Sequence, residues 1–491
     1  MMSQKFLPLL LLLLISPFVE ENGNFISTVF NNMENEFKSS NGSFIIETVE
    51  TYNKENAVKD VGNKEFDVSL SSKDIIDQVG FGWNLGNTFD SYDDDYLPNQ
   101  GLSSETYWGN PKTTYEMIKT LAKKGIKTLR IPVTWHNHLI DDKYTIDPEW
   151  IRRVKAVVDW AIDNDLYVIL NTHHDNADYN KDGIKYGYGY YPFWNDAIES
   201  ENFLYNIWRQ IAIAFNNGYD HHLIFEGLNE PRLKGLENEW WYDEDDSNCK
   251  EAAAVLNEYN RLILKAIRDS EGNNLYRFVL IAPYCVDISS VMSSDFVIPE
   301  DKINPSIQLP TNYKKTNRVL ISIHSYSPYN LVMNPDMKIT KFTEEFKDDL
   351  YERFKNLYVT LIKKGYNVII GETGIINKNN TEDRINWGKY YISTCRKYQI
   401  ATMIWDNGNW DNSVSAETTY ALFDRVNLKW YNDNIIDAFI KSGNTPLEDN
   451  SDIFETDLRE TFDTINMVID KKDKSFSSDF SSRDLVDQMQ F

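Results

Sequence analysis

Cysteine, basic residues and long apolar runs are all scarce in this chain. Three cysteines among 491 residues cannot form a disulfide framework, so either one bridge with a free thiol or no bridge at all is expected. Lys and Arg number 50 against 75 Asp and Glu, so no basic surface is expected to bind nucleic acid. The apolar run at residues 6–15 is too short to span a bilayer and has the pattern of a signal peptide. The sequence therefore predicts a secreted, extracellular protein that binds no membrane once a signal peptide over residues 1–20 is cleaved.

Between residues 67 and 442, short apolar runs alternate with amphipathic stretches. Strands are expected at residues 79–84, 126–131, 166–171, 222–227, 277–282, 319–323, 367–371 and 401–405. Helices are expected at residues 113–124, 149–163, 200–216, 252–269, 343–364 and 382–397. This alternation predicts an α/β fold, the (β/α)8 TIM barrel. A doubly wound open sheet is disfavoured, because polar motifs follow nearly all of the strands rather than one switch point.

Two glutamates follow buried strands in this region. Glu230 lies in LIFEGLNEP, residues 223–231, and Glu372 lies in VIIGETG, residues 368–374. Barrel enzymes carry their catalytic groups at the carboxyl ends of the strands, where these two side chains are expected to meet. A carboxylic acid beside a carboxylate suits cleavage of a glycosidic bond, because one group protonates the leaving oxygen and the other faces the positive sugar carbon.

The other strand ends carry polar and aromatic motifs too. They are GFGWNLGNTFD (80–90), KTLRIPVTW (127–135), YVILNTHHD (167–175), ISIHSYSPY (321–329) and MIWDNGNW (403–410). Together with the two glutamate motifs, these segments resemble glycoside hydrolase family 5, in its endoglucanase (cellulase) branch, over essentially the whole barrel region. The resemblance implies that Glu230 is the acid/base and Glu372 the nucleophile of a retaining double displacement that needs no cofactor.

Further polar residues are expected around the catalytic pair. The amide of Asn229 is placed to donate to a sugar 2-hydroxyl. Arg130 ends the second strand, where its charge would lower the pKa of Glu372. The family resemblance places His173 at the sugar of the cleaving subsite, with His174 behind it. No carboxylate or histidine at ligand spacing accompanies this pair, so no metal is expected.

The remaining candidates follow other strands. His324 and Tyr326 match the family pair that flanks the nucleophile, and the Tyr326 hydroxyl is expected to donate to it. Trp405 matches the floor under the sugar at the cleaved bond, and Asn84 is expected to contact sugars further away. Four more aromatic residues are candidate cleft walls: Trp135, Tyr190, Trp194 and Trp410.

The sequence thus predicts a monomeric, secreted endo-β-1,4-glucanase whose partner is a β-glucan polysaccharide: cellulose, mixed-linkage β-glucan or xyloglucan. One alternative is a β-mannanase or xylanase, because these enzymes share the scaffold and the glutamate pair. Another is a carbohydrate-binding protein that has lost catalysis, which is disfavoured because both glutamate motifs are intact.

The segments that flank the barrel region are polar. Residues 21–66 predict a loosely ordered N-terminal arm, and residues 443–479 predict a linker. Residues 480–491 repeat residues 70–81 at a constant offset of 410, with six identities in twelve positions. We interpret this match as the start of a second, truncated repeat, so that the chain is a fragment of a tandem multi-module enzyme.

Overall fold

The computed structural model describes residues 49–93, 99–179, 185–301, 309–315, 317–336, 338–413 and 416–447. The expected signal peptide, the first part of the N-terminal arm, the linker from residue 448 and the repeat at 480–491 lie outside these residues. Within the part of the chain that is described, no helix has both the length and the apolar character needed to cross a bilayer.

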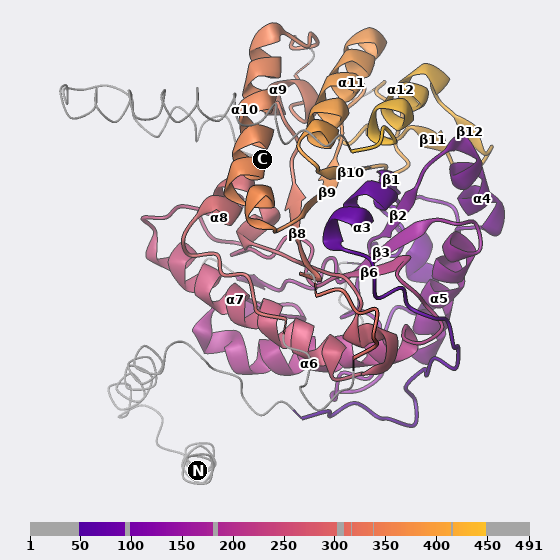
Figure 1. Ribbon diagram of the computed structural model, residues 1–491, viewed down its shortest axis with the longest axis vertical. Coiled ribbons are helices and arrows are strands. Elements are labelled where there is room, and N and C mark those ends of the chain that lie inside the picture. The colour runs from indigo at the N-terminus through magenta and orange to yellow at the C-terminus, as the bar shows by residue number, and fades with distance from the viewer. Residues whose placement is uncertain are drawn as a thin grey trace. The chain divides into compact units, whose positions relative to one another are not determined.

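Eight parallel strands close into a barrel in the order β1-β10-β9-β8-β7-β6-β3-β2 (Figure 1). They are β1 (Phe81–Asn84), β2 (Thr128–Ile131), β3 (Tyr167–Asn171), β6 (Leu223–Glu226), β7 (Val279–Ile281), β8 (Val319–His324), β9 (Val368–Thr373) and β10 (Ala401–Ile404). Every residue of these strands is buried, which is why their sequences are nearly continuous apolar runs. The closed parallel barrel confirms the (β/α)8 fold and excludes the open sheet.

Helices connect the strands on the outside of the barrel. The longer ones are α4 (Tyr115–Lys124), α5 (Pro148–Ile162), α6 (Ala197–Ala214), α7 (Ser247–Arg268), α10 (Glu344–Thr360), α11 (Thr381–Lys397) and α12 (Asp433–Gly443). Shorter elements are α8 (Ile288–Met292), α9 (Tyr329–Val332) and the two-stranded sheets β4 (Asp178–Tyr179) with β5 (Lys185–Tyr186) and β11 (Phe423–Asp424) with β12 (Lys429–Trp430). Helix starts follow local rules: Thr114 caps α4 through the Met117 N–H, and Asp147 caps α5 ahead of Pro148.

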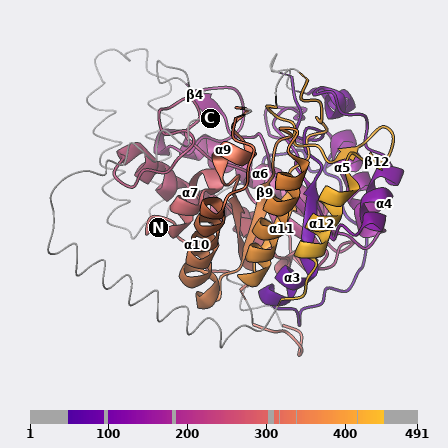
Figure 2. The ribbon, with the colours of Figure 1, turned by 90° about the horizontal axis from the view of Figure 1, so that it is seen from above.

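α3 (Ser72–Val79) closes the barrel at the amino ends of the strands. Ser71 and Asp74 cap the helix with reciprocal hydrogen bonds. Ile75 and Val79 are fully buried against inward-facing side chains of the strands. In Figure 2, α3 and β4 lie at opposite ends of the barrel. The first copy of the repeated segment is therefore a barrel plug that leads into β1.

Residues 49–66 correct the expectation of a loosely ordered arm, because they pack against the barrel. The Thr51 N–H donates to the side chain of Asn206 on α6 at 2.7 Å, and Glu50 pairs with Arg209 at 2.6 Å. The polar residues of this stretch give it the composition of a disordered segment. In the structure, however, they bind polar groups on α6. The barrel unit therefore begins before residue 67.

The three cysteines are unpaired, so the chain has no disulfide bridge. This is one of the two states that the sequence left open. Burial raises the pKa of each thiol, which makes these side chains behave as small, unreactive apolar groups. They are Cys249, Cys285 and Cys395.

Candidate active site

A bulge in β9 shapes the rim of the barrel where the two glutamates meet. Ile323 pairs with Ile370, but the next residue, His324, pairs with Glu372, so Gly371 is an extra residue in β9. A Cβ atom on Gly371 would lie 3.2 Å from His324 Nε2, a tight contact that favours glycine here. A bulge re-aims the side chains beside it. The Gly-Glu sequence at the end of β9 thus sets the direction of Glu372.

Arg130, near the carboxyl end of β2, is the centre of the site. Its Nη1 donates to Glu372 Oε1 at 2.7 Å and its Nη2 donates to Asn229 Oδ1 at 2.7 Å. Its Nε donates to Glu226 Oε2 at 2.7 Å, so a fully buried guanidinium lies between two carboxylates. Burial works against the charge of Arg130, but Glu226 and Glu372 outweigh this effect and raise its pKa. The expected contact between Arg130 and Glu372 is present.

Glu372 is buried and has two hydrogen-bond donors. In addition to Arg130, the Tyr326 hydroxyl donates to Glu372 Oε2 at 3.0 Å, as expected from the sequence. Burial raises the pKa of Glu372, and the charge of Glu230 acts in the same direction, whereas His324 and Arg130 act against them. The two donors fix the orientation of this carboxylate.

Glu230 lies opposite Glu372, and one carboxyl oxygen of each lies within 4.8 Å of the other. His324 Nδ1 is 2.7 Å from Glu230 Oε1, and Arg232 Nη1 is 3.8 Å from Glu230 Oε2. Arg130 Nη2 lies 3.5 Å from the other ring nitrogen of His324. Since arginine can only donate, this contact favours the tautomer that donates from Nδ1 to Glu230. The Glu230 side chain is 20% exposed against 7% for Glu372, so it is the more accessible of the pair.

The titrations of the two carboxyl groups are linked by their proximity. Burial raises the pKa of Glu230, but the hydrogen bond from His324 and the charges of His324 and Arg232 outweigh burial and hold this pKa below its usual value. Two carboxylates this close in a buried site cannot both ionise easily, so the pair tends to hold one proton. The arrangement therefore combines an acid and an anion at one place.

Glu226 belongs to the site although no sequence motif singled it out. It is fully buried, and in addition to Arg130 it accepts hydrogen bonds from Ser322 Oγ at 2.6 Å and Asn171 Nδ2 at 3.1 Å. A strand-end glutamate outside the Asn-Glu-Pro motif carries no distinct signal. The sequence signal that could have found Glu226 is its position as the last residue of β6, on the same rim as Arg130.

The expectation that Asn84 contacts sugars is wrong. Asn84 is fully buried, its Nδ2 donates to Gly371 O at 2.9 Å and to Ile404 O at 3.2 Å, and its Oδ1 accepts from Arg130 at 2.9 Å. As the last residue of β1 it points into the barrel and joins three strands. Asn229 differs, because Arg130 occupies its oxygen while its Nδ2 has no hydrogen-bond partner among the described residues.

His173 lies next to Glu372, and Trp405 lies next to His173. Their rings are parallel within 1°, with centroids 5.9 Å apart, and His173 Nε2 is 4.0 Å from Glu372 Oε1. Asn171 Nδ2 lies 3.1 Å from His173 Nδ1 and fixes the ring. A Cβ atom on Gly86 would lie 2.7 Å from the Trp405 ring, so the glycine of the WNLGNT motif makes room for this indole. His173 therefore borders Glu372, and Trp405 is the stacking partner of His173.

His173 and His174 have a carboxylate neighbour, contrary to the expectation from spacing. His174 Nε2 is 4.0 Å from Asp90 Oδ2, and the three residues offer ligand atoms within 4.8 Å of one another. Asp90 comes from the loop after β1, so sequence spacing could not reveal the contact. Its oxygens already accept the N–H groups of Asn87 and Thr88 at 3.0 and 2.6 Å. If metal ions affect activity, this cluster of Asp90, His173 and His174 is the place where their binding is to be tested.

The candidate cleft walls are mostly packing residues. Trp135 and Tyr190 are buried, and Trp194, in the short 3-10 turn just before α6, packs on the hydrophobic core. The Trp410 ring stacks on Tyr431, with centroids 4.7 Å apart and 8° between the planes. Sequence alone cannot separate a stacked or buried aromatic residue from one that faces a cleft.

Two exposed tryptophans near the site were missed in the sequence. Trp108 is 39% exposed, and its ring centroid is 5.5 Å from that of His174. Trp240 is 42% exposed, and the Arg232 guanidinium lies 3.9 Å from its ring centroid. Both sit on loops, where their exposure could not be judged from composition.

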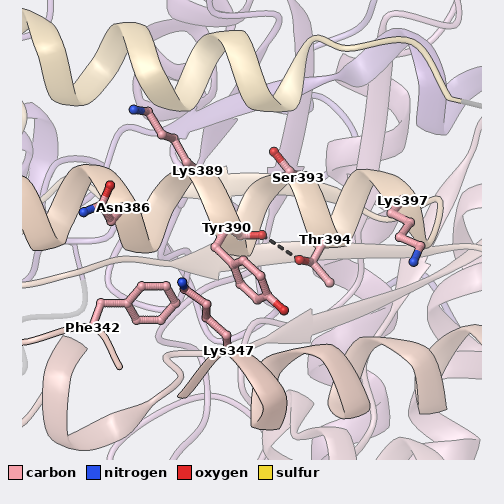
Figure 3. Close-up of a pocket in the computed structure, with 8 residues that line it drawn as sticks. All are labelled: Phe342, Lys347, Asn386, Lys389, Tyr390, Ser393, Thr394 and Lys397. Carbon is pink, nitrogen blue, oxygen red and sulfur yellow. Dashed lines mark hydrogen bonds between the residues drawn. The ribbon is translucent and has the colours of Figure 1, made fainter. Parts of the chain in front are cut away.

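A hollow of about 620 Å³ lies away from the site, between α10 and α11 (Figure 3). Lys347, Lys389 and Lys397 line it together with Tyr390. Because no candidate site residue lines it, this hollow is not the active site.

Comparison with known proteins agrees with the geometry. The Cellulase model of glycosyl hydrolase family 5 matches residues 90–411. The chain belongs to glycosyl hydrolase family 5. Endoglucanase 1 of Ruminococcus albus is 38% identical over 378 residues, covering 75% of this chain and 80% of that protein. Endoglucanase A of Clostridium longisporum is 38% identical over 374 residues, covering 76% of this chain and 66% of that protein.

Solved structures of family 5 share the fold. A variant of the family 5 lichenase from Caldicellulosiruptor sp. F32, in complex with cellotetraose, has a TM-score of 0.69 and 34% identity, covering 78% of this chain and 98% of that one. A broad-specificity endoglucanase from Ruminococcus champanellensis with bound cellotriose has a TM-score of 0.66 and 35% identity, covering 76% of this chain and 99% of that one. The family membership confirms the resemblance seen in the strand-end motifs.

Proposed function

We propose that this family 5 chain is an endo-β-1,4-glucanase that cleaves internal bonds of β-glucans with retention of anomeric configuration. The observation that carries the proposal is the carboxyl pair, whose nearest oxygens lie within 4.8 Å of one another. Retaining glycosidases set their carboxyl groups about 5–5.5 Å apart, whereas inverting ones need about 6.5–9.5 Å to admit a water. The short separation supports retention.

Glu372 is the nucleophile and Glu230 the acid/base in this mechanism. The direct hydrogen bond from Arg130 stabilises the anion of Glu372. Glu230, the more exposed of the pair, carries the proton that passes to the leaving oxygen in the reacting complex. Glu372 attacks the sugar carbon while Glu230 protonates the leaving oxygen, which breaks the glycosidic bond and forms a glycosyl ester on Glu372. Glu230, now ionised, takes a proton from water, and that water releases the sugar from Glu372.

The surrounding residues hold the reacting groups in place. The free amide of Asn229 donates to the sugar 2-hydroxyl, a contact that strengthens in the transition state. Tyr326 restrains the nucleophile and His324 restrains the acid/base through the hydrogen bonds described above. The Trp405 ring forms the floor beneath the sugar whose bond is cleaved, with His173 beside it.

The comparisons support a β-glucan as the substrate. The two curated relatives are named endoglucanases, and the two structural neighbours carry cellotetraose and cellotriose. Initial rates on carboxymethylcellulose, mixed-linkage β-glucan, xyloglucan, galactomannan and xylan, measured side by side, test this assignment. We expect hydrolysis of the glucans. Faster hydrolysis of galactomannan or xylan would favour the β-mannanase or xylanase alternative, and hydrolysis of none would refute an enzymatic function.

We also propose that the enzyme acts as a monomer outside the cell. The signal-like run at residues 6–15 supports secretion, and the substrate is a polymer that cannot enter a cell. Mass spectrometry of protein recovered from the culture medium should show an N-terminus near residue 21, and light scattering should give the monomer mass. A protein retained inside the cells with residue 1 intact would contradict secretion.

A further inference from the structure

Two of the seven histidines of the chain, His221 and His222, lie apart from the rest. The other five lie at or after the carboxyl ends of β2, β3 and β8, on the rim that carries the two glutamates. His221 and His222 directly precede β6, so they lie at the amino end of the barrel, opposite that rim. The proposed mechanism therefore gives this pair no role.

Asp220 and the two histidines form a compact cluster of groups that can bind a metal ion. Each of the three side chains offers a nitrogen or a carboxyl oxygen within 4.8 Å of the others. Asp220 Oδ1 and His222 Nδ1 are already 2.9 Å apart. Neighbouring ligands of an ion that is bound at about 2.0–2.2 Å lie roughly 3 Å apart, so this pair needs little movement. The rings of His221 and His222 are direct neighbours, with centroids 4.5 Å apart and 33° between their planes.

Two atoms of this cluster are free to bind an ion. His221 Nδ1 is buried and has no hydrogen-bond partner among the described residues. Such atoms are rare, because a buried polar group has lost its water and normally gains a protein partner instead. Asp220 uses only Oδ1 for its contacts with the backbone N–H and the ring of His222, which leaves its Oδ2 without a partner in the same part of the chain. An ion bound between His221 and Asp220 satisfies both atoms.

The cluster is accessible to a small cation. The side chains of His222 and Asp220 are 31% and 21% exposed. The charges of Asp220 and Asp67 attract a cation at His221, whereas the charge of Arg277 repels it. Arg277 donates to backbone oxygens, including Asp220 O at 2.8 Å, and not to the Asp220 carboxyl group. The carboxyl group thus stays available to the ion.

We propose that Asp220, His221 and His222 bind one zinc ion at the amino end of the barrel, with water completing its coordination. Two imidazoles and one carboxylate suit Zn²⁺, whereas Ca²⁺ and Mg²⁺ require oxygen ligands. The ion has a structural role. The Phe66 ring packs edge-on against the His221 ring, with centroids 6.1 Å apart, so fixing His221 fastens the segment that leads into α3 to the start of β6.

Equilibrium dialysis of EDTA-treated protein against Zn²⁺ tests the site. Cellotriose, the sugar bound by one of the structural neighbours, is added to cover the histidines and carboxyl groups of the cleft. The unaltered protein should bind one Zn²⁺ per chain. Its Tm should rise by about 2–5 °C at a free ion concentration of about 100 times Kd, because the ion binds the folded state alone.

Two variants each remove one ligand and keep the local packing. Asp220→Asn keeps an oxygen that accepts the His222 N–H, and His221→Phe keeps a ring that packs on Phe66. Each should bind one ion fewer than the unaltered protein and lose the rise in Tm, with turnover unchanged because the cluster lies opposite the active site. Asp165→Asn is the matched control, because it removes one exposed acid from the turn before β3 at the same end, and it should still bind the ion.

The outcomes decide for or against this site. No zinc on the unaltered protein would overturn it, as would equal numbers of ions on the unaltered protein and on a variant that is folded by circular dichroism. If neither variant folded, anomalous X-ray scattering at the zinc edge would decide on crystals of the unaltered protein. A peak between Asp220 and His221 would support the site, and peaks only elsewhere would overturn it.

Discussion

Replacing Glu226 by glutamine removes one of the two negative charges that Arg130 binds while it preserves the size of the side chain. In the native site, Arg130 Nε contacts Glu226 and Nη1 contacts Glu372, each at 2.7 Å. In the variant, the positive charge of Arg130 acts on Glu372 alone. The anion of Glu372 is then stabilised more strongly, so the pKa of Glu372 should fall.

The expected shift is about one pKa unit, which corresponds to about 1.4 kcal/mol. Since Glu372 reacts as the anion, a lower pKa keeps it active at lower pH. The acidic limb of kcat/KM against pH should therefore move down by about one unit. Glu226→Ala should instead destabilise the fold by about 3–5 kcal/mol, because it leaves a buried arginine partly unpaired.

Steady-state kinetics on an aryl β-cellobioside from pH 3 to pH 9, together with thermal unfolding, measure both effects. Glu105→Gln is the matched control, since Glu105 is also buried and pairs with Arg153 at 2.7 Å, away from the carboxyl pair. The control should lose stability without a shift of the acidic limb. A limb that stays in place or moves to higher pH in folded Glu226→Gln would refute the role given to this charge.

Three more predictions concern the same site. Glu230→Ala should nearly abolish hydrolysis of cellulose but spare aryl cellobiosides with good leaving groups, which need little protonation; equal losses on both would contradict the acid role. Tyr326→Phe removes a donor to the Glu372 anion, so the pKa of Glu372 should rise and the acidic limb should move to higher pH; a shift to lower pH would contradict the contact. Incubation with EDTA should leave turnover unchanged, and a loss that Ca²⁺ or Zn²⁺ restores would assign a metal to the cluster of Asp90, His173 and His174.

The eight strands and the meeting of Glu230 and Glu372 at one rim could be predicted from sequence, because they depend on local signals. Fully buried parallel strands need continuous apolar runs, and residues at their carboxyl ends converge on one rim, so Glu230 and Glu372 were found from their positions alone. The contact of Asp90 with His174 could not be found, because it joins loops after different strands. Pairings between distant residues leave no periodicity in the sequence.

Besides contacts between distant residues, the sequence also did not reveal the direction in which a side chain points. Asn84 lies in a polar motif at the end of a strand, yet it points into the barrel and binds backbone groups of β9 and β10. Trp240 stands out only once its exposure and its contact with Arg232 are known. The polar stretch at residues 49–66 looked disordered in composition, but α6 offers partners for its side chains.

Covalent trapping tests the central claim most directly. Incubation with 2,4-dinitrophenyl 2-deoxy-2-fluoro-β-cellobioside should form a stable glycosyl-enzyme, because the fluorine slows both displacements while the good leaving group speeds only the first. Peptide mass spectrometry should then place a single fluorocellobiosyl ester on Glu372. An ester on Glu230 or any other residue, or no ester together with α-anomer as the first product in proton NMR, would contradict the retaining mechanism and the assignment of the pair.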